Sequence, residues 1–402
     1  MLTTAEAIDR INAAVRPLDT ERIALAGAAG RVLRQQVVAE RDQPPFDRVT
    51  MDGIAVSFKA LERGIRRFGI ETRHHAGDPP VALGSESSCI EVMTGAVLPQ
   101  GADCVIPVER IEVTDGTAEI EQDYEAQRRQ FVHGRGSDYR MASELLAPGA
   151  LITPVDVAIV ASAGLAEVEV ARRPAIRVIS TGNELVPPGL PVAAHQIRLS
   201  NGPAVVAMLV QQGFTDCRHD LLKDDRASLR ARIAEHLDHA DVLILSGGVS
   251  MGKADFVPAV LAELGVSTVF HKISQRPGKP MWFGTGPRGQ AVFALPGNPV
   301  STLVCCRHYV LPALLRASGR RDPPPEFALL TEEVTFRPEL TWFLPVRLQS
   351  DIDGRLRARP VPTNTSGDFA SLGGTDGYVE LARDCSHFPP GTAAPLHRWA
   401  AP

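Results

Sequence analysis

The residues best suited to chemistry in this chain lie in a glycine-rich turn between an apolar run and a helical pattern. The apolar run covers residues 241–245, and the turn after it contains Ser246, Gly247, Gly248, Val249, Ser250, Gly252 and Asp255. Glycine has no Cβ atom, so backbone N–H groups can approach a ligand closely, and a helix that begins after the turn directs its positive end toward the same point. Such a turn can hold a phosphate or another anion. Turns of this kind also occur as purely structural connections in α/β folds, and the pattern alone leaves that interpretation open.

Three other polar loops also follow apolar runs. They are residues 180–184, which end in Glu184, residues 276–280, which contain Arg276, Pro277, Gly278 and Lys279, and residues 296–299, which read Pro296, Gly297, Asn298 and Pro299. In a doubly wound sheet the ligand lies at the carboxyl ends of the strands, where all four loops are expected. We therefore predict that the loops meet at one crevice, in which two cations would neutralise an anionic ligand.

A central α/β domain, predicted over residues 173–322, would position these loops. The run at 241–245 has the length and apolarity of a buried parallel strand, and apolar residues recur at helical spacing from Val257 to Leu264. A second helix is predicted to begin with Asn201 as its cap and to end at Gly213, and a third begins at residues 298–299. Strands alternating with helices predict a parallel sheet.

Shorter elements flank this domain on both sides. Thr3 and Glu6 have capping-box spacing at the start of a short helix, and a second helical patch is predicted near residues 25–33. Residues 1–45 together with about 146–172 would form a small N-terminal helical or linker domain. Alternating runs broken by glycine and proline predict a β-rich domain at 46–145 and a C-terminal β domain at 326–402. The predicted fold class is multidomain α/β plus β, with the doubly wound domain at its centre.

Composition and charge argue against several functional classes. The chain of 402 residues has 42 Lys and Arg against 47 Asp and Glu, and a net charge of −5 argues against a nucleic-acid binder. It has no apolar run of about 18 residues, and acidic residues stand where a signal peptide would be apolar, so we expect a cytoplasmic protein without a membrane segment. Its 6 cysteines lack Cys-x-x-Cys spacing, so neither a cysteine-based zinc site nor a disulfide framework is expected.

Four motifs make the chain resemble the molybdopterin molybdenumtransferase family (MoeA and the gephyrin E-domain). They lie at residues 180–184, 246–250 with Gly252 and Asp255, 277–280 and 295–299. The resemblance covers nearly the whole chain. It implies an enzyme of molybdenum cofactor biosynthesis that takes molybdate and adenylylated molybdopterin as substrates and releases AMP with the help of Mg²⁺. It also implies a homodimer, which could associate with molybdopterin adenylyltransferase and with molybdoenzyme maturation proteins.

The resemblance assigns roles to individual residues. The catalytic residues would be Asp52, Asp138, Glu184, Asp255 and Lys279. Asp255 and Glu184 would bind Mg²⁺, which prefers hard oxygen ligands. The residues that would contact molybdopterin or molybdate are Ser246, Gly247, Gly248, Val249, Ser250, Gly252, Arg276, Pro277, Gly278, Pro296, Gly297, Asn298, Pro299 and Ser371. On local chemistry alone, Asp52 can instead be a turn residue and Asp255 a helix cap.

The chain departs from the family pattern at four loop positions. Ser137 replaces an acid, Ala142 and His195 replace glycines, and His133 stands where arginine is frequent. These departures leave open a non-catalytic molybdopterin-binding or scaffold protein. Molybdopterin adenylyltransferase is a further alternative, because its single domain resembles residues 174–322, although it lacks the flanking segments.

Overall fold

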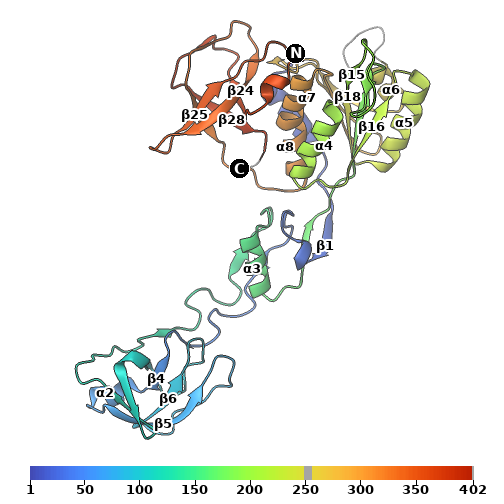
Figure 1. Ribbon diagram of the computed structural model, residues 1–402. Helices are drawn as coiled ribbons and strands as arrows, with labels where there is room; N and C mark the ends of the chain where they lie inside the picture. The colour runs from blue at the N-terminus through green and yellow to red at the C-terminus, as the bar shows by residue number, and fades with distance from the viewer. Residues whose placement is uncertain (249–255, 401–402) are drawn as a thin grey trace. The chain divides into compact units, whose positions relative to one another are not determined.

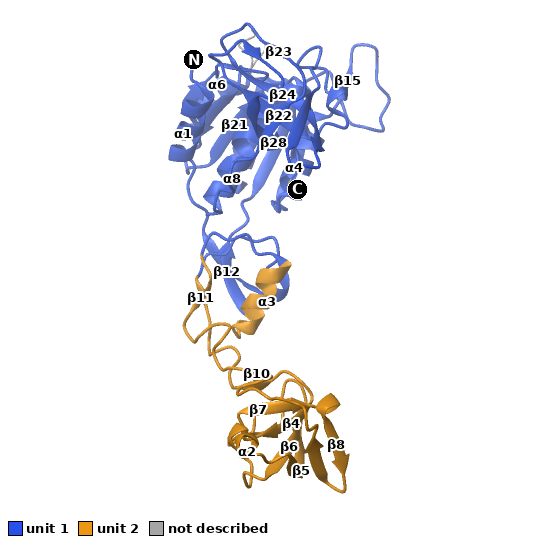
Figure 2. Cartoon of the chain, turned by 90° about the vertical axis from the view of Figure 1, so that its left-hand side faces the viewer, with its two compact units in different colours: residues 1–35, 148–153, 167–402 blue, residues 36–147, 154–166 orange. Residues whose placement is uncertain are grey.

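Two compact units make up the chain in the computed structural model, which describes residues 1–248 and 256–400. The first unit contains residues 1–35, 148–153 and 167–402, and the second contains residues 36–147 and 154–166 (Figure 2). Each unit has a hydrophobic core of its own. The division into four domains that the sequence predicts is finer than these two units and stays a prediction.

A six-stranded mixed sheet lies at the centre of the first unit (Figure 1). Its strands are β13 (Ile176–Thr181), β16 (Cys217–Leu222), β17 (Val242–Ser246), β18 (Ser267–His271), β20 (Trp282–Thr285) and β21 (Ala291–Leu295). In the order β16-β13-β17-β21-β20-β18, the first four run parallel and β20 is antiparallel to both of its neighbours. The predicted doubly wound α/β domain is confirmed.

Both faces of this sheet are apolar, so helices cover both. In β17, Ile244 packs into the core on one side, and Leu243 and Leu245 pack into the core on the other side, as the alternation of a strand requires. The elements of the first side are α1 (Thr4–Ala14), α4 (Asn201–Gln211), α7 (Pro299–Cys305), the π-helical segment η3 (Cys306–Val310) and α8 (Leu311–Ala317), and those of the second side are α5 (Arg226–His239) and α6 (Val257–Glu263).

The N-terminal helix α1 packs on the α/β core. Its predicted capping box is confirmed, because Thr3 Oγ1 accepts a hydrogen bond from the Glu6 N–H at 3.2 Å and the Glu6 carboxylate accepts one from the Thr3 N–H at 2.7 Å. Ala7 and Ile11 are fully buried among the residues of the sheet and of α8. The apolar face of α1 is therefore covered by the α/β part, and not by residues 146–172 with which the sequence analysis grouped it.

The prediction of a helical patch near residues 25–33 is wrong. Only one 3₁₀ turn, η1 (Leu25–Gly27), forms there, directly after β1 (Thr20–Ala24). β1 pairs antiparallel with β12 (Glu167–Ala171), and Leu33 forms a bridge with Val170. Backbone pairing with residues far away in the sequence holds this segment extended and overrides its weak helical pattern.

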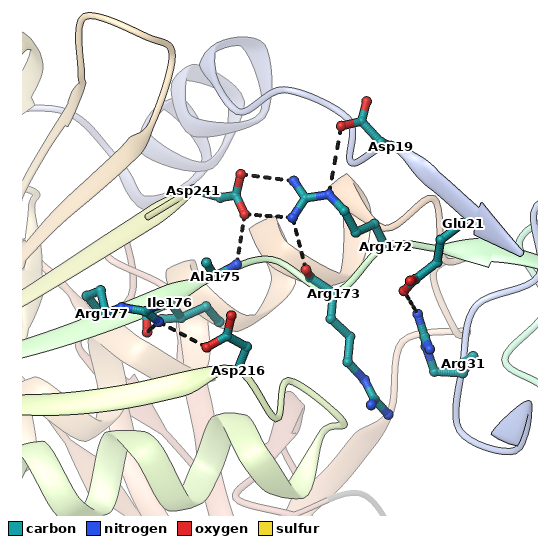
Figure 3. Close-up of polar contacts among 10 residues, drawn as sticks. All are labelled: Asp19, Glu21, Arg31, Arg172, Arg173, Ala175, Ile176, Arg177, Asp216 and Asp241. Atoms are coloured by element: carbon teal, nitrogen blue, oxygen red, sulfur yellow. Dashed lines mark hydrogen bonds and ion pairs between the residues drawn. The ribbon is translucent and has the colours of Figure 1, made fainter. Parts of the chain in front are cut away.

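Hydrogen-bonded ion pairs join the entry of β13 to the start of β17. Arg172 donates two hydrogen bonds of 2.9 Å to Asp241, which also accepts one of 2.7 Å from the Ala175 N–H (Figure 3). Burial raises the pKa of Asp241, but the hydrogen bonds from Arg172 and Ala175 and the charge of Arg172 lower it more, so the net pKa lies below the ordinary value. Arg177 on β13 donates to Asp216 at 3.1 Å in the same region.

The C-terminal part of the first unit is a closed β-barrel. Its strands are β22 (Phe327–Leu330), β24 (Thr341–Ser350), β25 (Leu356–Pro360), β26 (Gly377–Leu381) and β28 (Ala393–Arg398). The ring closes because β24 pairs with β26 as well as with β25. A two-residue strand of the α/β part, β19 (Gln275–Arg276), adds to β24 in parallel. The loop that carries Arg276 is thus attached to the barrel by backbone pairing.

The second unit is β-rich, as predicted. Its six-stranded sheet, in the order β7-β4-β6-β5-β9-β8, consists of β4 (Gly53–Val56), β5 (Arg67–His74), β6 (Ser88–Val92), β7 (Cys104–Pro107), β8 (Ile111–Thr114) and β9 (Thr117–Ile120). The remaining elements of this unit are β2 (Val37–Val38), β3 (Arg48–Val49), α2 (Phe58–Glu62), η2 (Val108–Arg110), β10 (Val132–His133), β11 (Glu144–Leu146) and α3 (Pro154–Ser162). Within residues 1–248 and 256–400, every helix is too short or too polar to span a bilayer.

Candidate functional site

A pocket of about 710 Å³ lies where β13, β17 and β21 end. Predicted site residues that line it are Glu184, Ser246, Gly247, Gly248, Pro296, Gly297, Asn298 and Pro299. The barrel side contributes Gly367 and Phe369, and the short parallel pair β14 (Leu185–Val186) and β15 (Ile197–Arg198) forms another wall. Parallel strands end at the same edge of a sheet, so loops far apart in the sequence meet here.

Glycines let the loops at the bottom of this pocket touch each other. Gly247 and Gly248 have φ values of +98° and +65°, and a Cβ atom on Gly247 would lie 2.5 Å from the carbonyl oxygen of Thr181. A Cβ atom on Gly297 would lie 3.6 Å from the Cα atom of Gly247, so the two loops are in van der Waals contact. No side chain fits at Gly247, which leaves its backbone open to the pocket.

Two buried oxygen atoms in the pocket have no hydrogen-bond partner among the described residues. They are Thr181 Oγ1 and Asn201 Oδ1. Asn201 uses its amide N–H groups to bridge two loops, donating to Ser246 Oγ at 2.9 Å and to the Gly297 carbonyl at 2.7 Å. Buried polar atoms are nearly always paired, so these oxygens are suited to a ligand that donates hydrogen bonds or to a cation.

Asn201 is not the helix cap that the sequence analysis predicted. α4 begins at Asn201, its N-cap is Ser200, and no side chain caps the helix. The amide instead reaches across to the ends of β17 and β21, and a contact with residues 45 and 96 positions away has no local signal in the sequence. Thr181 was likewise missed, although it stands beside Gly182 in one of the recognised motifs.

A second pocket, of about 470 Å³, lies between the α/β part and the barrel. Arg276, Pro277, Gly278 and Lys279 line it, and Pro280, Pro296 and Asn298 line both pockets. The Arg276 and Lys279 side chains are exposed and form no ion pair with any described residue, and Arg276 lies over the ring of Phe336 at 5.7 Å. The two cations are therefore available to an anionic ligand that spans the two pockets.

Four C-terminal residues with hydrogen-bonding side chains line the second pocket, namely Thr363, Asn364, Thr365 and Ser366, and the predicted Ser371 is not among them. Ser366 lines the second pocket, and its Oγ accepts a 2.6 Å hydrogen bond from the Asn298 side chain. Ser371, in the 3₁₀ turn η4 (Ala370–Leu372), lines neither pocket and donates to Asp368 at 2.7 Å. Both hydroxyls are thus paired within the protein, but only Ser366 also lines a pocket.

Asp52 and Asp138 belong to the second unit and are positioned there by different partners. Asp52 Oδ1 accepts two 2.7 Å hydrogen bonds, from the backbone N–H and from the hydroxyl of Thr94, and these bonds lower the pKa of Asp52. Asp138 lies 2.9 Å from His133 Nε2, and His133 Nδ1 lies 3.0 Å from the Arg48 guanidinium. Because Arg48 can only donate, Nδ1 accepts and Nε2 carries the proton that points to Asp138.

Two of the four departures from the family pattern, at His133 and Ala142, differ in their structural effect in the second unit. His133, at a position where arginine is frequent in the family, supplies the contact to Asp138. Ala142, at a position where glycine is common, adopts φ +65°, a left-handed conformation that a Cβ atom disfavours.

Four predicted site residues lie outside the described residues, namely Val249, Ser250, Gly252 and Asp255. The part of the glycine-rich turn that the structure describes ends at Gly248, and α6 starts at Val257. The candidate site is therefore defined by the ends of the strands and by the other three loops.

Another hollow, of about 630 Å³, lies at the opposite edge of the sheet. Its lining includes Arg16, Arg172 and Arg288, but Arg172 is paired with Asp241 and the other two donate to backbone carbonyls. Each of these three arginines already makes a hydrogen bond or ion pair within the protein, whereas Arg276 and Lys279 form no ion pair with a described residue, so we place the functional site at the carboxyl ends of the strands.

Comparisons with known proteins agree with this geometry. The model of the MoeA N-terminal region (domain I and II) matches residues 2–164, that of the probable molybdopterin binding domain matches residues 177–316, and that of the MoeA C-terminal region (domain IV) matches residues 328–399. The molybdopterin molybdenumtransferase of Synechocystis sp. is 36% identical over 400 residues, which cover 99% of this chain and 100% of that protein.

The chain belongs to the molybdopterin molybdenumtransferase family. The Haemophilus influenzae molybdopterin molybdenumtransferase is 34% identical and covers 78% of the chain, which covers 77% of that protein. The crystal structure of a molybdopterin biosynthesis MoeA protein from Pyrococcus horikoshii superposes with a TM-score of 0.84 at 30% identity and covers 100% of both chains. The chain is thus a transferase of molybdenum cofactor biosynthesis, and the resemblance noted in its motifs is confirmed.

Proposed function

We propose that this molybdopterin molybdenumtransferase family member binds adenylylated molybdopterin across the two adjoining pockets, inserts molybdate and releases AMP in an Mg²⁺-dependent reaction. The observation that carries the proposal is the combination of an open glycine turn, two unpaired buried oxygens and two free cations in adjoining pockets. Each feature suits a phosphoanhydride, which needs N–H donors, positive charge and a metal ion.

The chain's own residues would divide the work of binding. The backbone of Gly247 and Gly248 faces the first pocket, where it can donate to phosphate oxygens. Lys279 and Arg276 in the second pocket would neutralise the negative charge that develops when the phosphoanhydride P–O bond breaks. In this step AMP leaves, and water bonds to the phosphorus that remains on molybdopterin. Asp52 and Asp138 belong to the second unit, and the resemblance to the family is the basis for proposing that they bind metal, orient the substrate or activate water.

The donor set of the first pocket fits Mg²⁺. Glu184 offers hard carboxylate oxygens, and the described residues of the lining include neither cysteine nor histidine. Glu184 would hold the ion, together with Asp255 beyond the described part of the turn. When bound, Mg²⁺ would supply positive charge to phosphoryl oxygens.

Molybdate, a tetrahedral dianion and a substrate, is proposed to bind near Ser366, Asn298 and Pro296, which line the second pocket. Ser371 would act on this site only through the turn that it stabilises by its bond to Asp368. Ser366→Ala is therefore expected to raise the molybdate concentration that gives half-maximal turnover more than Ser371→Ala does.

AMP release from adenylylated molybdopterin by the full chain tests the proposal. Release is expected to require Mg²⁺ and molybdate and to yield cofactor that reconstitutes a molybdoenzyme. Tight binding without release in any condition would instead support the scaffold alternative. The adenylyltransferase alternative predicts formation of the AMP adduct from ATP, and the matches to the MoeA N- and C-terminal regions count against it.

Lys279→Ala provides a specific test of the cation at the second pocket. Loss of its charge should slow AMP release about 100-fold, which is typical for removal of one group that stabilises developing charge. Lys59→Ala is the matched control, because Lys59 lies in the second unit and pairs with Glu86 on its surface. Equal rates in the two variants would remove Lys279 from the mechanism.

We also propose that the protein is a homodimer in the cytoplasm. It could associate with molybdopterin adenylyltransferase or with molybdoenzyme maturation proteins. These proposals rest on the resemblance to the family. Light scattering on the purified chain should give twice the monomer mass of 43.2 kDa. A monomeric mass at micromolar concentration would contradict the dimer.

A further inference from the structure

Three side chains with ligand atoms suited to a transition metal meet where the barrel packs on the α/β part. They are His308 in the π-helical segment η3, Glu380 in β26 and His397 in β28. Their ligand atoms all lie within 4.8 Å of one another. No motif in the sequence links them, since Glu380 lies 72 positions after His308 and His397 lies 17 positions after Glu380.

The backbone of the barrel fixes two of the three side chains. β26 and β28 pair antiparallel with Tyr378 opposite His397, and their rings stack at 5.0 Å. Glu380 stands two residues after Tyr378, so it points to the same face of the sheet. His397 Nε2 lies 3.2 Å from Glu380 Oε2, and about a quarter of each of the two side chains is exposed (25% and 26%). An ion can therefore reach this pair from solvent.

The third side chain, His308, has a buried nitrogen without a partner. Only 5% of the residue is exposed, and Nε2 forms no hydrogen bond with any described residue. Its other nitrogen, Nδ1, lies 3.2 Å from the Tyr378 hydroxyl. When Nδ1–H donates to that hydroxyl, Nε2 keeps a free lone pair. A metal-bound histidine usually has this arrangement, with its second ring nitrogen donating to a neighbouring acceptor.

We propose that His308, Glu380 and His397 bind a divalent transition-metal ion, preferably Zn²⁺, at the junction of the α/β part and the barrel. Two imidazoles and one carboxylate with a fourth position open to water form a known zinc ligand set. Magnesium avoids nitrogen ligands, so this site is chemically distinct from the Mg²⁺ site proposed above, and it does not rest on the proposed function.

Metal binding would require the three side chains to move closer together. Zinc–ligand bonds of about 2.0–2.2 Å place tetrahedral ligand atoms closer together than 4.8 Å, so the ion would draw the side chains inward. The hydrogen bond between His397 and Glu380 would be replaced by bonds to the metal.

An ion at this site would affect the wall of the second pocket. Phe343 packs against His308 with ring centroids 4.3 Å apart, and Phe343 also lines that pocket. η3 continues directly into α8, and α7 precedes it after the loop with Asn298. Short π-helical segments are frequently found at functional sites. The site would therefore fix the barrel against the helix that follows this loop.

Zinc titration of the full chain, stripped with a chelator, tests the proposal. One equivalent of Zn²⁺ should bind by calorimetry, and Co²⁺ in its place should give the visible spectrum of a tetrahedral site with nitrogen ligands. Glu380→Gln keeps the side-chain volume on a partly exposed position and should weaken binding at least about 100-fold. Tyr378→Phe, which removes the hydroxyl beside Nδ1, should weaken it about 10-fold or more.

His387→Gln is the matched control. His387 lies 3.0 Å from Glu333 in an exposed histidine–glutamate pair, and no third His, Cys, Asp or Glu ligand joins this pair among the described residues. This variant should bind zinc as the parent does. Absence of a one-equivalent binding step in the parent would overturn the proposal, and so would equal loss of binding in the Glu380 and His387 variants, which would indicate adventitious surface binding. His308→Gln, if folded, should behave like Glu380→Gln.

Discussion

At the scale of single residues, the candidate site depends on backbone positions that exclude a side chain. Gly247 combines a positive φ with a neighbouring carbonyl oxygen 2.5 Å from its missing Cβ atom. Many other glycines with positive φ, such as Gly354, have open space around them. The requirement for glycine is therefore twofold at Gly247, conformational and steric, and only conformational at Gly354.

Gly247→Ala is expected to slow turnover about 100-fold and to leave the chain folded. The added Cβ atom must displace the strand end at Thr181, and a shift of about 1 Å at a reacting group can cost about 100-fold in rate. The free energy of unfolding should fall by about 1–3 kcal/mol. Gly354→Ala should cost about 1 kcal/mol and leave AMP release unchanged. Full activity in Gly247→Ala would show that the turn does not contact the substrate.

Ala142→Gly should stabilise the second unit. Ala142 has φ +65°, a left-handed conformation that costs a residue with a Cβ atom about 1–2 kcal/mol. The added chain entropy of glycine offsets about 0.5–1 kcal/mol of this gain, so urea denaturation should show a net rise of about 0.5–1 kcal/mol in the free energy of unfolding. Ala126→Gly is the control, because Ala126 has no positive φ and the added chain entropy should cost about 0.5–1 kcal/mol. A loss of stability in both variants would contradict this account of Ala142.

At the scale of elements, polar contacts decide where the strands of the central sheet begin. Asp241 precedes β17 and accepts hydrogen bonds from Arg172 and from the N–H of Ala175, just before β13. It thereby sets the parallel register in which Ile176 lies opposite Val242. The ends of the same strands carry the candidate site, so the register also decides which residues meet in the pocket.

Asp241→Asn should destabilise the first unit by about 1–2 kcal/mol at pH 7, since hydrogen bonds to a charged group are lost at a partly exposed position. The pKa of Asp241 is lower in the folded state than in the unfolded state. The ionised carboxylate therefore stabilises the fold fully at pH values above the unfolded-state pKa of about 3.9. This stabilisation is lost as the pH falls through the lower folded-state pKa. The difference between parent and variant in urea denaturation should shrink toward pH 3. Asp238→Asn, at an exposed aspartate 3.8 Å from Arg288, should have little effect at either pH.

At the scale of the whole molecule, two units with separate cores share one chain. Ile54 is fully buried in a core of the second unit, and Ile244 is fully buried in a core of the first. The chain crosses between the units several times, because residues 36–147 and 154–166 are inserted in the first unit. Such a protein is not expected to unfold in one two-state transition.

Calorimetry of two core variants tests this division. Ile54→Ala should lower the transition of the second unit, and Ile244→Ala that of the first, each by about 2–5 kcal/mol of stability. Each variant serves as the control for the other. A single transition that moves equally in both variants would show that the units unfold together.

The sequence by itself determined the local features of this protein. Apolar runs of strand length, the capping box at Thr3 and Glu6, and the glycine and proline loops depend on neighbouring residues, so the α/β class and part of the pocket lining could be predicted from them. The motifs also sufficed to predict the family. The extended conformation of residues 28–33 could not be predicted, because the pairing partners of this segment, Val170 among them, lie more than a hundred positions away.

Only the tertiary structure decided which polar atoms are already paired. It assigned Asn201 to a bridge between two loops, paired Ser371 with Asp368, attached β19 to the barrel, and placed His308, Glu380 and His397 together. Each of these depends on chain segments that meet only after the sheet and the barrel have formed. Spacing along the chain carries no signal for such contacts, because side-chain proximity across elements is set by strand register and helix packing.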